Sequence, residues 1–423
     1  MTETLPTLAP RTDGPDWLRQ SRSEAAERAL AQGWPSLDDE DWRHSRIADL
    51  DLQAMVPADE AGPTDEALEQ ILAELLASIG DYSALVVTRD GYVVGLDRGD
   101  AGLEIIDLAL PGAAAAALQG GRSGDLFGEL NTAQAPSPVV VRSAAGAVIE
   151  RPVVVAHLTG RDGFSTWPRL VIEAGQGSQL TVVELWLSAD VASLSVPRTD
   201  VVAGRDAVVR HVVLSDLGPR MRQVATLNCD AGHGAAITSA TVALGSVYSR
   251  FRIDAGLGED NGEVRLLAAY FAEDDQVHDF RTVQDHRAKR TSSDLVFKGA
   301  VSGRARSVYS GVIRVNPGAS GTSAFLTNRN LVLSAEARAY SVPNLEIVNE
   351  NDLRSCGHAA TSGPLDPDQI FYLESRGVPT EVARRLIVLG FFDDVVSKVP
   401  VPGLREVVRE RVGRRLRSTE GIA

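Results

Sequence analysis

A loose internal repeat in the middle of the chain is the feature that most limits its possible folds. From about Pro138 to Asn351, short apolar runs rich in β-branched residues alternate with turns of small residues, without helical periodicity. Typical units are VVVRSAAGAVIERPVVV and DVVAGRDAVVRHVVL. The turn glycines stand at 146, 175, 204, 232 and 256, which gives spacings of 29, 29, 28 and 24 residues, and two later ones, Gly303 and Gly321, are 18 apart.

A β-solenoid explains this repeat. One unit of this length cannot bury its apolar face alone, whereas stacked units close a core and pair each strand with its neighbours above and below. A β-sandwich with accidental turn spacing is the alternative, but its hairpins match strand lengths around two-residue turns. Here the turn motif lies inside a longer unit. We therefore expect a mainly β fold with a stacked parallel solenoid over 138–351.

Composition restricts the class of protein. Hydrophobic residues make up 44% and charged residues 23% of the 423 positions, so the chain can bury a core without disulfides. Its net charge of −15 argues against nucleic-acid binding, because a phosphate backbone would be repelled. The sequence contains no apolar run long enough for a membrane helix and no secretory leader pattern, and it has only two cysteines. We expect a cytoplasmic protein that does not contact membranes.

Helical segments flank the predicted solenoid and define three regions. These are an N-terminal helical and mixed α/β region over 1–137, the solenoid over 138–351 and a C-terminal helical region over 352–423. The predicted elements outside the solenoid are helices over 16–32 and 65–78, a hairpin over 84–94, and helices beginning near Asp366, Thr380 and Gly403.

Cys356 and His358 form the only Cys-x-His pair in the sequence. A thiolate and an imidazole are suitable ligands for iron or zinc, and Gly357 would let the backbone bring both toward one centre. Two donors cannot complete a four-coordinate site. A loop cysteine and a surface histidine with no shared task are the alternative. Because His358 follows the last predicted strand and precedes the helix start at Asp366, we expect it on an exposed connection.

The other polar candidates have structural explanations. Cys229 lies in an alternating run and is expected in the core. Asn328 and Asn330 would stack inside a solenoid turn. His278 and His286 have neighbouring aspartates, which would suit a general base, but no nucleophile lies near them in the sequence. We interpret them as polar decoration of a strand or loop.

Two features bear on partners. The chain has three lysines, Lys289, Lys298 and Lys398, and none follows a glycine, so a GxxxxGK[ST] phosphate loop is absent and we expect no bound nucleotide. Leu386, Ile387 and Phe391 form an apolar helix face near the C-terminus. Such a face must be covered, either by the solenoid end or by a partner.

The C-terminal sequence resembles the SufB/SufD family, the scaffold subunits of the SUF iron–sulfur cluster assembly machinery. The resemblance is carried by NRNLVLSAEARAYSVPNLEI and SCGHAATSGPLDPDQIFYLESRGVPTEVARRLIVLGF, with SSDLVFKGAVSGRARSVYSGVIRVNPGASGTSA upstream and RQSRSEAAERALAQGWPSLDDEDWRHSRI near the N-terminus. SufB-type chains carry a cysteine where this chain has Ala337, and a Glu-His-Glu-Ala-Thr-like run where it has CGHAAT. The resemblance is therefore to the SufD type.

This resemblance implies a right-handed parallel β-helix and a non-catalytic scaffold role. It implies a complex with a SufB-type subunit and a SufC-type ABC ATPase, the latter docking on the helices over 366–399. A transient iron–sulfur cluster would form at the interface with the SufB-type subunit. His358 matches the cluster-site histidine of the family and Cys356 the neighbouring cysteine, whose role is less defined. The competing functions are a β-helix carbohydrate-active enzyme, a passive adhesin and a SufB-type scaffold.

Overall fold

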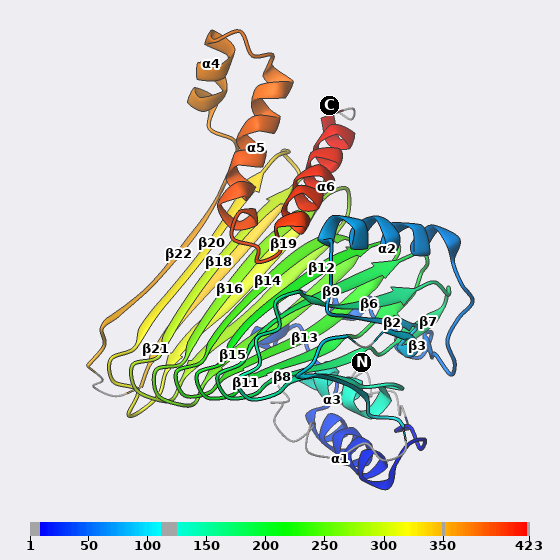
Figure 1. Cartoon of the computed structure of the whole chain (residues 1–423). Helices are drawn as coiled ribbons and strands as arrows, with labels where there is room; N and C mark the ends of the chain where they lie inside the picture. The colour runs from blue at the N-terminus through cyan, green and yellow to red at the C-terminus, as the bar shows by residue number, and fades with distance from the viewer. Residues whose placement is uncertain (1–8, 98, 111–124, 349–351, 421–423) are drawn as a thin grey trace.

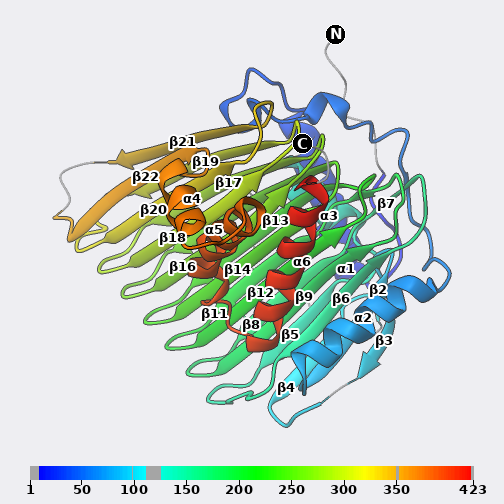
Figure 2. The same cartoon turned by 90° about the horizontal axis from the view of Figure 1, so that it is seen from above.

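Two long β-sheets stack face to face along the molecule and form a parallel β-solenoid (Figures 1 and 2). The computed structural model describes residues 9–97, 99–110, 125–348 and 352–420. From β11 onward, successive strands alternate between the two sheets, so each strand pairs in parallel with the strand two further along the chain. The predicted solenoid is thereby confirmed.

The strands have the following bounds. The first sheet contains β21 (Arg338–Ile347), β19 (Arg306–Val315), β17 (Val277–His286), β15 (Tyr248–Leu257), β13 (Arg222–Ala231), β11 (Arg198–Ala203), β8 (Arg169–Ala174), β5 (Val139–Ser143) and β4 (Leu103–Asp107), with the short strands β1 (Val56–Pro57), β7 (Phe164–Thr166) and β10 (Leu194–Ser195) beside them. The second sheet contains β22 (Ser355–Gly363), β20 (Ser323–Val332), β18 (Ser292–Val301), β16 (Glu263–Ala272), β14 (Ala236–Gly245), β12 (Val208–Leu217), β9 (Gln179–Ser188), β6 (Val153–Thr159), β2 (Ala84–Arg89) and β3 (Tyr92–Asp97). Only β2–β3 and β4–β5 pair antiparallel, at the N-terminal end.

The repeat glycines explain how closely the turns stack. A Cβ atom built on Gly175 would lie 2.7 Å from the Ser143 carbonyl oxygen of the preceding turn, and one on Gly232 would lie 2.7 Å from the Ala203 carbonyl oxygen. Glycine is required there because the backbones approach each other directly. Gly256 differs from the prediction, since it lies inside β15 and pairs with Asp285. The spacing of 24 residues therefore does not measure a turn-to-turn repeat.

The helices lie outside the two sheets. Their bounds are α1 (Asp16–Gln32), α2 (Glu66–Ile79), α3 (Leu126–Gln134), α4 (Pro367–Ser375), α5 (Thr380–Val396) and α6 (Pro402–Glu420), with the short 3₁₀ turns η1 (Glu40–Trp42) and η2 (Ile47–Asp49). The apolar faces of α2, α5 and α6 cover the outer face of the second sheet. The N-terminal segment and α3 cover part of the first sheet (Figure 1).

The predicted flanking elements agree closely with the structure. α1 has the predicted bounds, and Asp65 caps α2 by accepting hydrogen bonds from the backbone N–H groups of Ala67 and Leu68. Asp366 likewise caps α4. The sequence analysis missed α3, a nine-residue buried helix whose composition shows no clear apolar face. It also ended the solenoid at residue 351, whereas the last strand, β22, follows that boundary.

Candidate functional site

The solenoid is open at its C-terminal end. β21 pairs only with β19 and β22 pairs only with β20, so each offers one edge without a strand neighbour among the described residues (Figures 1 and 2). Strands of ten and nine residues are long for unprotected edges. An edge of this kind pairs readily with another chain unless something covers it. We call β21 and β22 together the open end.

Cys356 and His358 lie on β22 and face the solenoid interior. They are in register with Ala324 and Leu326 of β20, both of which are fully buried core residues. Because in-register residues of neighbouring strands point to the same side, the cysteine and histidine also point inward. Cys356 is half-buried and His358 exposed, since no further turn of the solenoid lies over them.

This placement corrects the sequence interpretation, which put His358 on an exposed connection between the solenoid and the helix at Asp366. The run SCGHAATSG contains one β-branched residue and therefore has weak strand propensity of its own. It is a strand because β20 supplies a complete ladder of backbone partners. The same strand geometry puts Cys356 and His358 two residues apart on one face, as the candidate site requires.

The chemistry of the open end is that of an incomplete ligand set. Partial burial raises the pKa of the Cys356 thiol, so the thiol stays protonated until a metal or a positive charge displaces the proton. Among the described residues, no group of three or more His, Cys, Asp or Glu side chains could hold a metal ion. Cys356 and His358 can therefore supply part of a site, and other donors must come from outside the described chain.

A buried polar network lies beside this site, inside the last turns. The Tyr270 hydroxyl donates to Asn330 Oδ1 at 2.6 Å and accepts from Asn328 Nδ2 at 3.1 Å. Ser341 of β21 donates to Asn328 Oδ1 at 2.5 Å, and Asn330 Nδ2 reaches Ser362 of β22 at 3.4 Å. The two asparagines thus lie on one face of β20 and point into the interior. Their hydrogen bonds connect both strands of the open end to Tyr270 in the solenoid core.

The other sequence candidates are core residues. Cys229 is fully buried, and burial raises the pKa of its thiol far above the usual range. His278 and His286 are strand residues of β17, one of the two expected placements, and both are buried. Burial lowers the pKa of each to about 4. Both side chains are bonded inside the solenoid, His278 Nε2 to the Gly245 carbonyl oxygen at 3.0 Å and His286 to two hydroxyl groups.

The C-terminal helices carry exposed apolar side chains. Leu386 on α5 is 50% exposed, and Phe371 and Tyr372 on α4 are 70% and 56% exposed. Phe391 of the predicted helix face instead packs near the solenoid, where Lys298 Nζ lies 4.7 Å from its ring centre. The sequence analysis did not name Phe371 or Tyr372 as contact residues.

A family model and three similar proteins agree with one another. The sequence model described as SUF system FeS cluster assembly, SufBD core domain, matches residues 157–391. An iron–sulfur cluster assembly SufBD family protein of Mycobacterium leprae is 34% identical over 281 residues, which cover 64% of this chain and 62% of that protein. The chain is also similar to the iron–sulfur cluster assembly protein SufD of Escherichia coli, with 26% identity over 93% of both chains. The SufD protein of Bacillus subtilis is 34% identical over 143 residues, about a third of each chain.

One further finding concerns membranes. Within the part of the chain that the structure describes, no helix is long and apolar enough to cross a bilayer.

Proposed function

Because this chain belongs to the SufBD family of SUF iron–sulfur cluster assembly proteins, we propose that it is a SufD-type scaffold subunit that builds clusters at an interface with a SufB-type subunit. Two observations favour the SufD type. The similarity to the Escherichia coli SufD protein extends over 93% of the chain, and alanine occupies position 337, where SufB-type chains are expected to carry a cysteine.

The open end is the observation that carries this proposal. A partner strand placed against β21 or β22 would satisfy a full row of backbone N–H and C=O groups. It would also cover apolar side chains such as Leu345 and Ile347, which are exposed on β21. A second solenoid with a matching end meets both requirements, since it continues the two sheets across the interface.

The cluster in this proposal is cargo, and the interface supplies its ligands. His358 offers a neutral imidazole to iron, and Cys356 offers a thiolate once iron displaces its proton. Burial raises the pKa of the Cys356 thiol, so ligation by this sulfur costs the removal of a proton, and we assign His358 the main role and Cys356 a supporting one. The remaining ligands come from the partner subunit.

The C-terminal helices are the proposed docking surface for a SufC-type ATPase. The chain has no phosphate loop of its own, so nucleotide hydrolysis falls to the partner. Exposed Leu386, Phe371 and Tyr372 provide the apolar contacts such docking needs. Ile387 and Phe391 would support the docking helix from the side nearer to the solenoid.

A substitution at His358 tests the proposal. The chain is co-expressed with its SufB-type and SufC-type partners, and the complex is isolated under anaerobic conditions. We expect His358→Ala to leave circular dichroism and complex size unchanged while iron and sulfide content fall strongly. Cys356→Ser should have a milder effect, and His358→Cys should recover part of the cluster content if the imidazole is a ligand.

Thr361→Ala is the matched control. Thr361 is another exposed residue of β22, and it pairs with Arg329 on the outward-facing side of the strand. This variant should assemble clusters at the parental level. Normal iron and sulfide content in the His358→Ala complex would refute the proposed role of the open end.

A further inference from the structure

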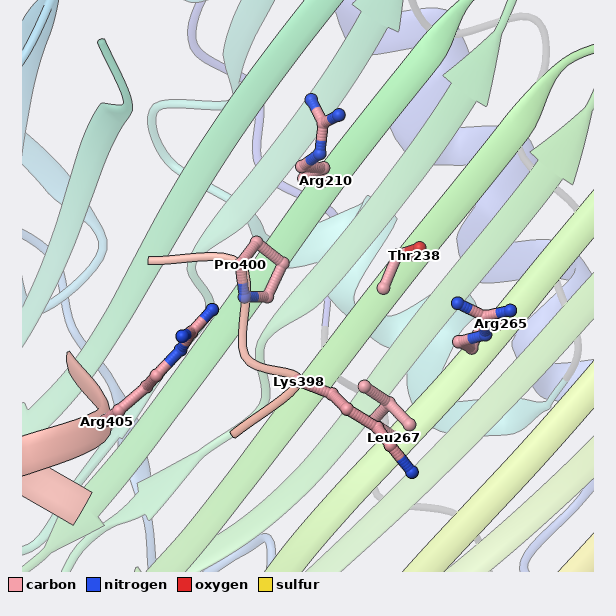
Figure 3. A pocket seen from close by; sticks show the side chains of 7 residues that line it. All are labelled: Arg210, Thr238, Arg265, Leu267, Lys398, Pro400 and Arg405. Atoms are coloured by element: carbon pink, nitrogen blue, oxygen red, sulfur yellow. The ribbon is translucent and has the colours of Figure 1, made fainter. Parts of the chain in front are cut away.

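A small cationic pocket lies on the outer face of the second sheet, far in sequence from Cys356 and His358 (Figure 3). Its volume is about 280 Å³, and its lining includes four cationic side chains and no acidic one. These side chains, with one hydroxyl between them, are Arg210, Thr238, Arg265, Lys398 and Arg405. The chain as a whole carries 57 acidic against 42 basic residues, so this local charge is opposite to that of the molecule.

The strand register builds one wall of the cationic pocket. Arg210 of β12, Thr238 of β14 and Arg265 of β16 are in-register neighbours on three adjacent strands. Adjacent strands lie about 4.8 Å apart, so the two arginines project from the same face roughly 10 Å apart. Arg265 also has an in-register carboxylate, Asp294 of β18, but the two side chains are 3.7 Å apart, whereas those of the in-register pair Arg142 and Glu173 are 2.6 Å apart.

The positive charges of this pocket are incompletely neutralised. Lys398 and Lys298 share one carboxylate, Asp394, each at 2.9 Å, and together they lower the pKa of that carboxyl to about 2. The carboxylates paired with Arg265 are 3.6 and 3.7 Å away, beyond hydrogen-bond distance. The guanidinium group of Arg210 has no hydrogen bond or ion pair with any residue that the structure describes.

Arg405 adds a cation on the helical side of the pocket. Its Nε donates to the Val399 carbonyl oxygen at 2.8 Å, which anchors the guanidinium beside the α5–α6 connection. Arg405 also lies near the start of α6, whose first turn contains no acidic residue. The positive end of the helix dipole therefore adds to the charge of the arginine. Figure 3 shows Arg405, Arg210 and Arg265 on different sides of the pocket.

We propose that this pocket binds a phosphate-class anion, namely inorganic phosphate or diphosphate. Guanidinium groups match phosphate oxygens with paired hydrogen bonds, and the Thr238 hydroxyl supplies a further donor. The pocket volume of about 280 Å³ suits a small anion. It is too small for a peptide, which needs an extended groove. A bound anion would join the sheet arginines to Lys398 and Arg405, and so fix the α5–α6 connection against the solenoid.

Calorimetric titration of the full chain with inorganic phosphate and with diphosphate tests the proposal, at constant ionic strength in a buffer free of phosphate. We expect one saturable site and tighter binding of diphosphate. Arg210→Gln with Arg265→Gln should weaken binding by about tenfold or more, because two charge-assisted contacts are lost. Saturating phosphate should raise the melting temperature of the parent chain and not that of the double variant.

The control is Arg220→Gln with Arg304→Gln, which removes the same charge from two exposed turn positions outside the pocket. This control should bind phosphate as the parent does. Should the sheet variant fold poorly, Arg405→Gln provides a second test with the same expected loss. Absence of saturable binding of phosphate and diphosphate would overturn the proposal. Binding of a hexaglutamate peptide to the pocket, without binding of phosphate, would also overturn it.

Discussion

At the scale of single residues, the polar interior is the part of the structure that sequence patterns describe least well. Asn328, Asn330, His278 and His286 are hydrophilic in any composition scheme, yet all four are buried in the solenoid. Each is tolerated because it meets a partner from a different strand, and the most distant of these partners in the sequence, Tyr270, lies 60 residues from Asn330. Such pairing depends on the exact stacking of the turns, which glycine spacing alone does not provide.

Gly299 illustrates how tightly this interior is packed. A Cβ atom at Gly299 would lie 1.9 Å from a ring carbon of Tyr270 and 2.7 Å from Asn330 Oδ1. The tyrosine ring cannot easily retreat, because its hydroxyl is bonded to both asparagines. We therefore expect Gly299→Ala to lower the free energy of unfolding by about 1–3 kcal/mol.

Urea unfolding monitored by circular dichroism measures this change. Gly363→Ala is the matched control, since a Cβ atom there has open space and the glycine is also a strand residue of the second sheet. Equal stability of the two variants would show that the ring moves aside without cost.

His278 makes stability depend on pH. Burial, together with the repulsion of a charged imidazole by Arg415 of α6, lowers its pKa to about 4. The unfolded chain takes up this proton near pH 6.5, whereas the folded chain does so only near pH 4. Stability attributable to this group is therefore complete above about pH 6.5 and is lost as the pH falls toward 4, by about 3 kcal/mol in total.

Urea unfolding at pH 7 and pH 5 tests this dependence. Between these two pH values, we expect the free energy of unfolding of the parent chain to fall by about 2 kcal/mol more than that of His278→Gln, because the glutamine does not titrate. Glutamine can still donate to the Gly245 carbonyl oxygen. If this variant does not fold, His286→Gln offers the same comparison, since burial also lowers the pKa of His286 to about 4. Parallel losses in parent and variant would contradict the assignment.

At the scale of elements, some segments take their structure from signals in their own sequence, and others take it only from pairing with a neighbouring strand. The helices α2 and α4 begin at capping aspartates, and α1 follows from the spacing of its apolar residues; both signals act within one segment. β22 does not, because its small and polar residues become a strand only when β20 lies beside them. The pair of candidate ligands could thus be found from the sequence by their type and spacing. Their position on the inward face of the last strand could not.

The apolar surface of the C-terminal helices gives an element-scale prediction. Leu386 is half exposed, so Leu386→Asp should leave the far-ultraviolet circular dichroism and melting temperature nearly unchanged. The same change should weaken co-purification with the SufC-type ATPase, because it puts a charge in the proposed apolar contact. Val388→Asp is the contrasting variant on the same helix, and its buried position predicts loss of folding. Unfolding of the Leu386→Asp chain would instead mean that Leu386 packs against the solenoid.

At the scale of the whole molecule, the two ends of the solenoid differ. At the N-terminal end, the outermost strand of each sheet, β3 or β4, pairs antiparallel with its neighbour. The C-terminal end stops at the parallel strands β21 and β22, and at both ends the outermost strands have one strand neighbour each among the described residues. The repeat in the sequence predicted the stacking, because each unit needs neighbours to bury its apolar face. It did not predict which strands form the two ends, since that depends on where the stacking stops.

This asymmetry predicts a gradient of local stability. In a stacked array each turn is held by its neighbours, so turns with one neighbour open more readily than turns with two. Native-state hydrogen exchange should therefore be slow in central strands such as β14 and β16 and fast in β21 and β22. Binding of the SufB-type subunit should slow exchange in β21 and β22 by pairing their free edges, while β3 and β4 at the other end stay unchanged and serve as the internal control. Protection of β3 and β4 in place of the open end would place the partner at the wrong end of the solenoid and refute the proposed assembly.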